Sequence, residues 1–197
     1  MEISFEKRYV PIYTLIVAVS HHIITNINYI NGEVIKKVWP VDAIILVFTL
    51  VFMSIFDRGI KERIALGIFY SKTPFEKALD YIKKDRRIKL NKHDEKDLNN
   101  ISNEKFYCKY YKKVKEKQII ISKNSEYCVI RDIVFTIFII CIVLIGLTLI
   151  WKKYFYNELF FSLIAYIIGI ISCRMKAKDF VRQIIIEEIK IEEERKK

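Results

Sequence analysis

The sequence lacks the motifs by which most enzymes are recognised. It contains no glycine-rich phosphate-binding loop, no HExxH motif and no serine or cysteine nucleophile motif. It has only four cysteines and three histidines, and no cysteine pair has the CxxC spacing of a zinc site. We therefore expect no catalytic residues, no metal site and no cofactor. We interpret the cysteines as reduced thiols used as small apolar residues.

Long uncharged runs are present instead. Residues 133–151 are nineteen residues without a charge, and residues 159–173 are fifteen more. A bilayer core about 30 Å thick needs about 20 such residues in a helix. A helix in a soluble core would carry polar residues on one face over such a length. The two runs therefore predict membrane-spanning helices.

Two further apolar blocks, residues 9–30 and 41–56, lie near the N-terminus. The first is long enough to span but contains two histidines and two asparagines. A signal peptide is the rival interpretation, with a basic pair, an apolar stretch and Ala18-Val19-Ser20 as its cleavage site. We expect a span, because the second block follows too soon to belong to a secreted domain.

The positive charge is concentrated between the two pairs of apolar blocks. The chain has a net charge of +11, and residues 58–131 carry 20 Lys and Arg against 10 Asp and Glu. We expect this segment to meet an anionic partner. Lys and Arg also cluster at the span ends on its side, which predicts that both termini and residues 58–131 are cytoplasmic.

These patterns predict an all-α integral membrane protein with two transmembrane helical hairpins flanking a basic helical cytoplasmic domain. We expect a multi-pass protein of the cytoplasmic membrane with both termini inside. The expected division is residues 1–57 for the first hairpin, 58–131 for the basic domain, 132–174 for the second hairpin and 175–197 for a cytoplasmic C-terminal helix.

Local signals indicate helices within the basic segment. Thr73-Pro74-Phe75-Glu76 has the residues of a helix start, with Thr as N-cap and Glu three residues later. We expect a polar loop at residues 92–94 and a helix that starts at Ser125-Glu126 and runs into the third span. Ile119-Ile120-Ile121 is a candidate short strand. The last span is expected to continue as an apolar stripe to Ile189.

Two clusters are candidates for binding an anion. The first is Lys83-Lys84-Asp85-Arg86-Arg87, because Arg offers phosphate a planar fork of donors. A solvated helix end, or a patch on anionic lipid headgroups, is the favoured explanation of this cluster taken by itself. The second is residues 106–113, where aromatics alternate with Lys, as stacking on bases and contact with phosphates require. An amphipathic helix with buried aromatics is the alternative. The predicted ligand-binding residues are Arg86, Arg87, Tyr107, Tyr111, Lys112 and Arg131.

Polar residues recur along one face of the first predicted span. Lipid cannot satisfy such groups, so this face is expected to line a pore or to hydrogen-bond to other helices. In the last span Ala165, Gly169 and Cys173 form a small-residue face that lets another helix approach closely. A channel built from four spans implies a homo-oligomer. The predicted pore-lining residues are Thr14, Ala18, His21, Thr25 and Asn28.

A longer pattern runs through residues 73–132. An aromatic precedes an Asp-x-Arg-Ile run, then Asn, two aromatics and Tyr-Lys follow, and a Tyr precedes Arg-Asp at the mouth of a span. The matching residues are Phe75, Asp85-Arg86-Arg87-Ile88, Asn103, Phe106-Tyr107, Tyr110, Tyr111-Lys112, Tyr127 and Arg131-Asp132.

This pattern resembles that of small bacterial membrane effectors in anti-phage loci, as in Hailong (HalB-like) and cyclic-oligonucleotide (CBASS) systems. The family's Trp is replaced by Phe106, and its His in the following helix is absent. The resemblance implies an effector that is gated by a nucleotide signal, permeabilises the inner membrane and acts beside a nucleotidyltransferase-like partner encoded nearby.

The expected function is therefore a nucleotide- or oligonucleotide-gated membrane effector that forms an oligomeric pore or disrupts the inner membrane. The alternative is a non-channel interaction protein. In that case the spans are an anchor, and the basic domain binds anionic lipid or a protein partner. No enzymatic activity is expected from the residues themselves.

Overall fold

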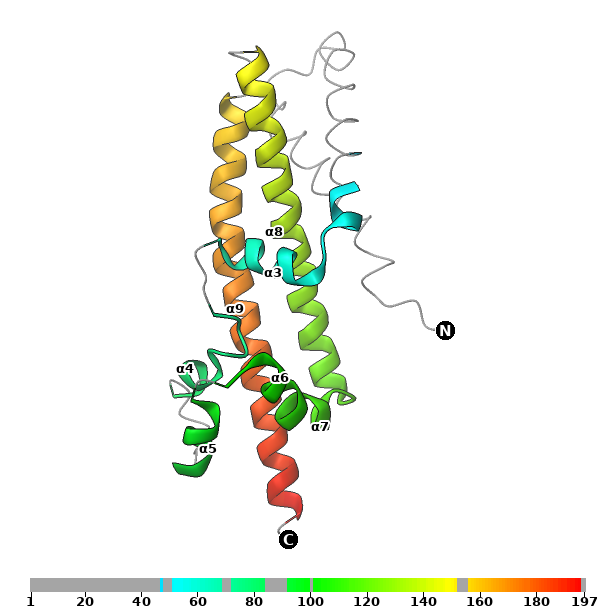
Figure 1. The fold of residues 1–197 in the computed structure, drawn as a ribbon. Helices are drawn as coiled ribbons and strands as arrows, with labels where there is room; N and C mark the ends of the chain where they lie inside the picture. Colours follow the sequence, from blue (N-terminus) through cyan, green and yellow to red (C-terminus); the bar gives the residue numbers. More distant parts are fainter. Residues whose placement is uncertain are drawn as a thin grey trace. The chain divides into compact units, whose positions relative to one another are not determined.

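The computed structural model describes residue 47 and residues 51–68, 72–83, 92–99, 101–151 and 156–195. These residues are helical or lie in turns, and none of them forms a strand, so the all-α class is confirmed for the described chain. A helical segment at residues 51–55 precedes the named elements (Figure 1). These are α3 (Arg58–Leu66), α4 (Ala78–Ile82), α5 (Lys92–Leu98), α6 (Asn103–Phe106), the π-helix η1 (Tyr107–Tyr111), α7 (Lys112–Val114), α8 (Gln118–Trp151) and α9 (Tyr156–Arg195).

The chain divides into two compact units. The first unit comprises Met1–Gly67 and Val129–Ile171, and the second comprises Ile68–Cys128 and Ser172–Lys197. The helices α8 and α9 are each unbroken and contribute residues to both units. Within each unit the two helices run antiparallel and side by side (Figure 1).

In the first unit, residues 51–66 pack on the apolar part of α8. Met53 is buried against Phe135 and Ile139, and the Phe56 ring meets the Phe135 ring edge-on at 5.6 Å. α3 begins where the Asp57 carboxylate accepts a hydrogen bond from the Ile60 N–H at 2.8 Å. It ends at Gly67, whose positive φ of 98° is a conformation that favours glycine.

The same unit contains a close contact between α8 and α9. A Cβ placed on Gly169 would lie 2.8 Å from Cγ2 of Val134, so no larger residue fits without a shift. The Tyr166 hydroxyl donates to the Ile64 carbonyl at 2.8 Å, which ties α9 to α3. The expected close approach at Gly169 is thus confirmed, and its partner is in the same chain. Ala165 is exposed and takes no part in this contact.

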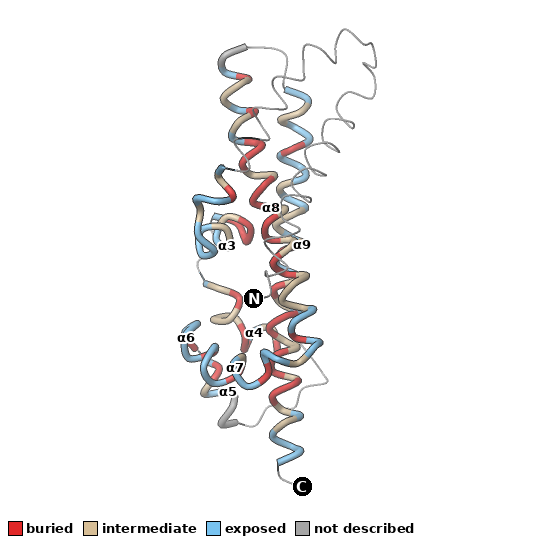
Figure 2. The backbone as a smooth tube through the Cα atoms, turned by 90° about the vertical axis from the view of Figure 1, so that its right-hand side faces the viewer, coloured by how far each residue is buried: buried red, intermediate tan, exposed pale blue. Residues whose placement is uncertain are grey.

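Two helices, α8 over Gln118–Leu149 and α9, are long and apolar enough to cross a membrane. In the first unit α9 is mostly exposed or half-buried, whereas α8 carries buried residues along its length (Figure 2). Large apolar side chains make up this exposed surface, including Phe160 at 61% and Ile167 at 58%. Exposing each to water would cost about 1.5–3 kcal/mol, so such a surface is typical of contact with lipid or protein.

In the second unit the core is an aromatic cluster on α9. Phe180 is 2% exposed and packs against Phe75, Tyr111 and Tyr127, with ring centroids 5.9–6.2 Å apart. Phe75 in turn stacks on Phe106 at 4.8 Å. One α9 side chain therefore holds the segment before α4, the η1 turn and the start of α8 together.

Ion pairs fasten the same elements to the part of α9 beyond Cys173, where the apolar run has ended. The pairs are Lys113 with Glu188, Lys117 with Glu187 at 2.8 Å, and Lys176 with Glu126 at 2.7 Å. Hydrogen bonds from Lys117 and Lys190 lower the pKa of Glu187. Burial raises the pKa of Glu188 and outweighs the opposing effect of Lys113. Glu188 therefore takes up a proton at a higher pH than its neighbour Glu187.

Several local expectations can be compared with the second unit. The Thr73 hydroxyl accepts from the Glu76 N–H at 3.4 Å, and the Thr73 N–H donates to the Glu76 carboxylate at 2.9 Å. The predicted reciprocal capping pair therefore forms. The predicted helix start was wrong, because residues 74–77 form a turn and α4 begins at Ala78 with Lys77 as its N-cap.

Three other local predictions were wrong. Residues 92–94 begin α5 rather than form a loop. Ile119–Ile121 belong to the first turn of α8, which begins at Gln118 and not at Ser125. In this turn Ile120 is buried, and its neighbours Ile119 and Ile121 are exposed. The continuation of the last span is confirmed, since α9 is one helix to Arg195 with Phe180, Val181, Ile184 and Ile185 buried.

Candidate basic ligand site

The helical stretch α6–η1–α7 carries the basic and aromatic residues singled out in the sequence. Phe106, Tyr110 and Val114 face the core and are at most 4% exposed. Tyr107 is 45% exposed, while Tyr111 is half-buried against Phe180. The interpretation as an amphipathic helix therefore holds for Phe106 and Tyr110, which are buried, whereas ligand binding by the exposed Tyr107 stays a prediction.

The predicted ligand-binding residues have different surroundings. Tyr107 and Tyr111 lie together, with ring centroids 5.3 Å apart, and Lys112 follows them on an exposed position. Arg86 and Arg87 lie outside the described residues, as do all five predicted pore-lining residues.

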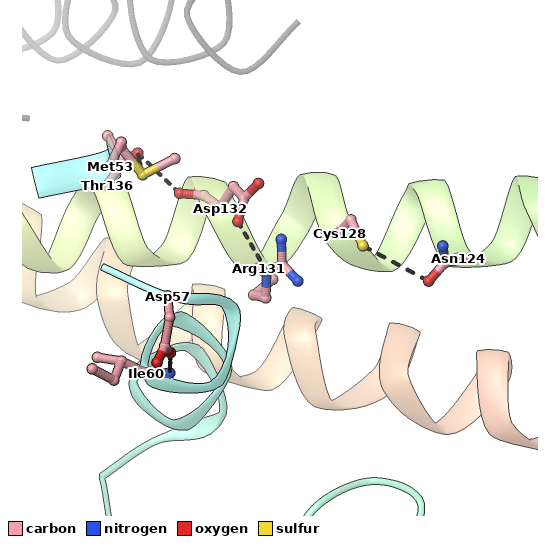
Figure 3. A network of polar contacts seen from close by, with 8 residues as sticks. All are labelled: Met53, Asp57, Ile60, Asn124, Cys128, Arg131, Asp132 and Thr136. Atoms are coloured by element: carbon pink, nitrogen blue, oxygen red, sulfur yellow. Dashed lines mark hydrogen bonds and ion pairs between the residues drawn. The ribbon is translucent and has the colours of Figure 1, made fainter. Parts of the chain in front are cut away.

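Arg131 belongs to the first unit and is buried in α8 (Figure 3). Its Nε donates to the carboxylate of the neighbouring Asp132 at 2.9 Å, and both residues are less than 10% exposed. On the next turn the Thr136 hydroxyl donates to the Asp132 carbonyl at 2.9 Å and contacts the Met53 sulfur at 3.8 Å. A buried, charge-paired guanidinium is typical of a structural contact at a span end.

An open pocket of about 580 Å³ lies in the second unit between α5 and the α6–η1 stretch. This volume is within the range of small-molecule sites, about 300–1,000 Å³. Its floor includes Ile101, which is 5% exposed. Polar side chains form the rest of its lining, namely Lys96, Asp97, Asn99, Lys105, Cys108 and Lys109.

The charge in this pocket is positive. Lys109 forms an ion pair with Asp97, and its ammonium group lies 5.5 Å from the centre of the Tyr110 ring. The hydrogen bond to Asp97 raises the pKa of Lys109, so this lysine is charged at neutral pH. Lys96 and Lys105 are exposed, and neither side-chain amine forms an ion pair within the described part of the chain. Two lysines are therefore available to an anion from solution.

The described lining of the pocket is rich in donors that can bind an anion. It contains amine and amide donors, one carboxylate and one thiol. Among the described residues no three His, Cys, Asp or Glu side chains come together as a metal site. Donors of this kind suit an oxyanion such as phosphate.

Sequence reasoning missed this pocket. Lys96 and Asp97 come from α5, and Lys105, Cys108 and Lys109 come from a stretch about ten residues later. The spacing of the last three places them on one helix face. Nothing local indicates that α5 would close the other side.

Comparisons with protein-family models, with curated proteins and with solved structures found no match to this chain.

Proposed function

We propose that this protein is a nucleotide- or oligonucleotide-gated membrane effector of the inner membrane, whose spans open a conducting path or disrupt the bilayer. The ligand binds the basic and aromatic surface of the second unit. Its contacts come from Arg86, Arg87, Tyr107, Tyr111 and Lys112. Arg131 is not included, because it is buried in the first unit and paired with Asp132. The proposed setting is anti-phage defence, with a nucleotidyltransferase as the source of the ligand.

The observation that carries this proposal is the continuity of two helices. The lysine-bearing stretch is tied to α9 by the Tyr111–Phe180 contact and by the Lys113–Glu188 pair. It leads through a short turn into α8. Both long helices contain the apolar runs that can cross a membrane. A ligand that shifts the stretch therefore acts on the two helices that contain those runs.

The proposal includes four spans, both termini in the cytoplasm and a homo-oligomer. The charge distribution supports the topology, since Lys and Arg are concentrated on residues 58–131. The exposed apolar surface of α9 supports contact with lipid or with other copies. Four helices are too few to enclose a wide channel, so several copies are required.

Dye release tests the proposal. The full chain is reconstituted into liposomes loaded with a self-quenched dye and titrated with a panel of cyclic and linear oligonucleotides. We expect release with one class of nucleotide and none without it. Arg86→Ala combined with Arg87→Ala should weaken the response at least tenfold, or about 1.4 kcal/mol. The matched control is Lys115→Ala, because Lys115 is an exposed lysine in the turn that follows α7.

The competing function is a membrane anchor whose basic unit binds anionic lipid. It predicts no dye release with any nucleotide, and strong binding of the second unit to vesicles that contain phosphatidylglycerol. A wild-type protein that binds such vesicles, binds no nucleotide and remains strictly monomeric at micromolar concentration would refute the effector proposal.

A further inference from the structure

We infer that the pocket between α5 and η1 is a phosphate-binding site, in which Lys96, Lys105 and Lys109 bind the phosphate oxygens and Asp97 competes with the phosphate for Lys109. Only the identity of the larger molecule that carries the phosphate, a nucleotide, rests on the proposed function. The site itself does not depend on gating.

The pocket has the charge and shape that a phosphate requires. The described lining includes three lysines and one carboxylate, and the Asn99 side chain adds an amide donor. Lys109 is already held in place by Asp97, with its side chain 44% exposed. A phosphate that enters between Lys96 and Lys105 therefore meets two unpaired amines and a third that it can take from Asp97.

A second observation points to the same place. Cys108 and Lys109 lie in the π-helix η1, and π-helices make up well under 1% of residues in globular proteins. Their single turns occur frequently at functional sites, because the wider turn changes where side chains point. Here the turn lies beside the pocket and supplies two residues of its lining.

The lining also limits the ligand class. None of the described residues in the lining is aromatic, so they offer no surface for stacking a base. The pocket therefore suits a phosphate or pyrophosphate group. Tyr107, which precedes Cys108 and is exposed, is the available stacking surface for the remainder of a nucleotide. A lipid headgroup phosphate has the same chemistry, and the experiment distinguishes the two sources.

Cys108 provides the measurement without any mutation. It is exposed, whereas Cys128, Cys141 and Cys173 are buried. The full chain is placed in nanodiscs of neutral phosphatidylcholine, and the rate of maleimide labelling is followed while inorganic pyrophosphate is titrated at constant ionic strength. We expect pyrophosphate to slow labelling in a saturable manner. Counting labelled cysteines by mass spectrometry shows whether each variant is folded, since only an unfolded chain labels at the buried positions.

Three variants test the named residues. Lys96→Gln with Lys105→Gln should raise the pyrophosphate concentration for half-protection by about tenfold or more. Asp97→Asn should lower it by about two- to fivefold, because it removes the competing charge of an exposed pair. Lys115→Gln is exposed and outside the pocket, and should change nothing.

A second set of nanodiscs contains phosphatidic acid and no pyrophosphate. One outcome is that Cys108 is protected only in these discs and that the double lysine variant loses this protection. This outcome supports the phosphate site but assigns it to lipid. It also argues against a soluble nucleotide as the ligand in the proposed function. The inference is overturned if neither probe slows labelling of the wild type. It is also overturned if Lys96→Gln with Lys105→Gln leaves the protection unchanged. Neither result refutes the proposed function, because a nucleotide could still gate the protein from another surface.

Discussion

Replacing Gly169 by alanine should destabilise the first unit, although the same change stabilises most helices. The added Cβ would lie 2.8 Å from Cγ2 of Val134 and 3.5 Å from its Cγ1. Carbon atoms in good contact lie about 3.5–4.0 Å apart, so the overlap is roughly 1 Å. Valine in a helix has one strongly preferred rotamer and cannot turn away without cost.

The magnitude follows from two opposing effects. Alanine is favoured over glycine in a helix by about 0.8–1.0 kcal/mol, and overpacking costs about 1–3 kcal/mol. The net destabilisation is therefore up to about 2 kcal/mol, and Gly169→Leu should exceed it. Gly146→Ala is the matched control, since a Cβ there has nothing within 4 Å. It should be neutral or stabilising.

The assay is thermal unfolding in detergent micelles, followed with a thiol-reactive dye that labels the buried Cys141 as the first unit opens. A background with Cys108→Ser, Cys128→Ala and Cys173→Ala removes the exposed thiol and the two buried thiols of the second unit, so that only Cys141 is labelled. Val134→Ala should restore part of the loss in Gly169→Ala, with a coupling of about 0.5–3 kcal/mol. The prediction would be refuted if Gly169→Ala and Gly146→Ala stabilised the protein equally and Gly169→Ala showed no coupling to Val134→Ala. That result would mean that Gly169 and Val134 are not in close contact.

Three further predictions address the second unit and the topology. Phe180→Ala should destabilise the second unit by about 3–5 kcal/mol, because it empties the centre of the aromatic cluster; Phe160→Ala, on an exposed position of the same helix, should cost much less in micelles. The lowered pKa of Glu187 adds stability that is complete above the unfolded pKa of about 4.3 and is lost as pH falls through the folded value. Glu187→Gln should therefore be less stable than wild type at pH 7, and the gap should close below about pH 4 in denaturant titrations; a constant gap would contradict this. Reporter fusions at Asn100 and Lys197 should both read as cytoplasmic, and a periplasmic signal at either would overturn the topology and the nucleotide-sensing proposal with it.

Short-range patterns in the sequence predicted structure well where the interaction is itself local. The Thr73–Glu76 capping pair depends on residues three apart, and it forms. The apolar stripe around Phe180 depends on helical spacing, and it is buried. The uncharged runs depend on length and composition alone, and they form helices that can cross a membrane.

Prediction failed where the outcome depends on distant residues. Ile119–Ile121 have the propensity of a strand, yet they join a 34-residue helix, because continuity with the rest of α8 outweighs local preference. The pocket depends on Lys109 meeting Asp97, twelve residues earlier, and no local rule places α5 against η1. The burial of Arg131 could not be predicted from the sequence either, because it depends on how distant parts of the chain pack around α8.

The π-helix has a consequence for the register of its own helix. The buried residues Phe106, Tyr110 and Val114 are spaced four and four, and eight residues of α-helix turn about 80° beyond two full turns. The wider η1 turn absorbs part of this excess, so Phe106 and Val114 point to the same core. Tightening η1 to an α-helix would rotate everything after it by up to about one residue, or 100°. Such a change would take Val114 off the core face that Phe106 and Tyr110 share, and the contacts of Tyr110 with Phe106 and of Tyr111 with Phe180 oppose it.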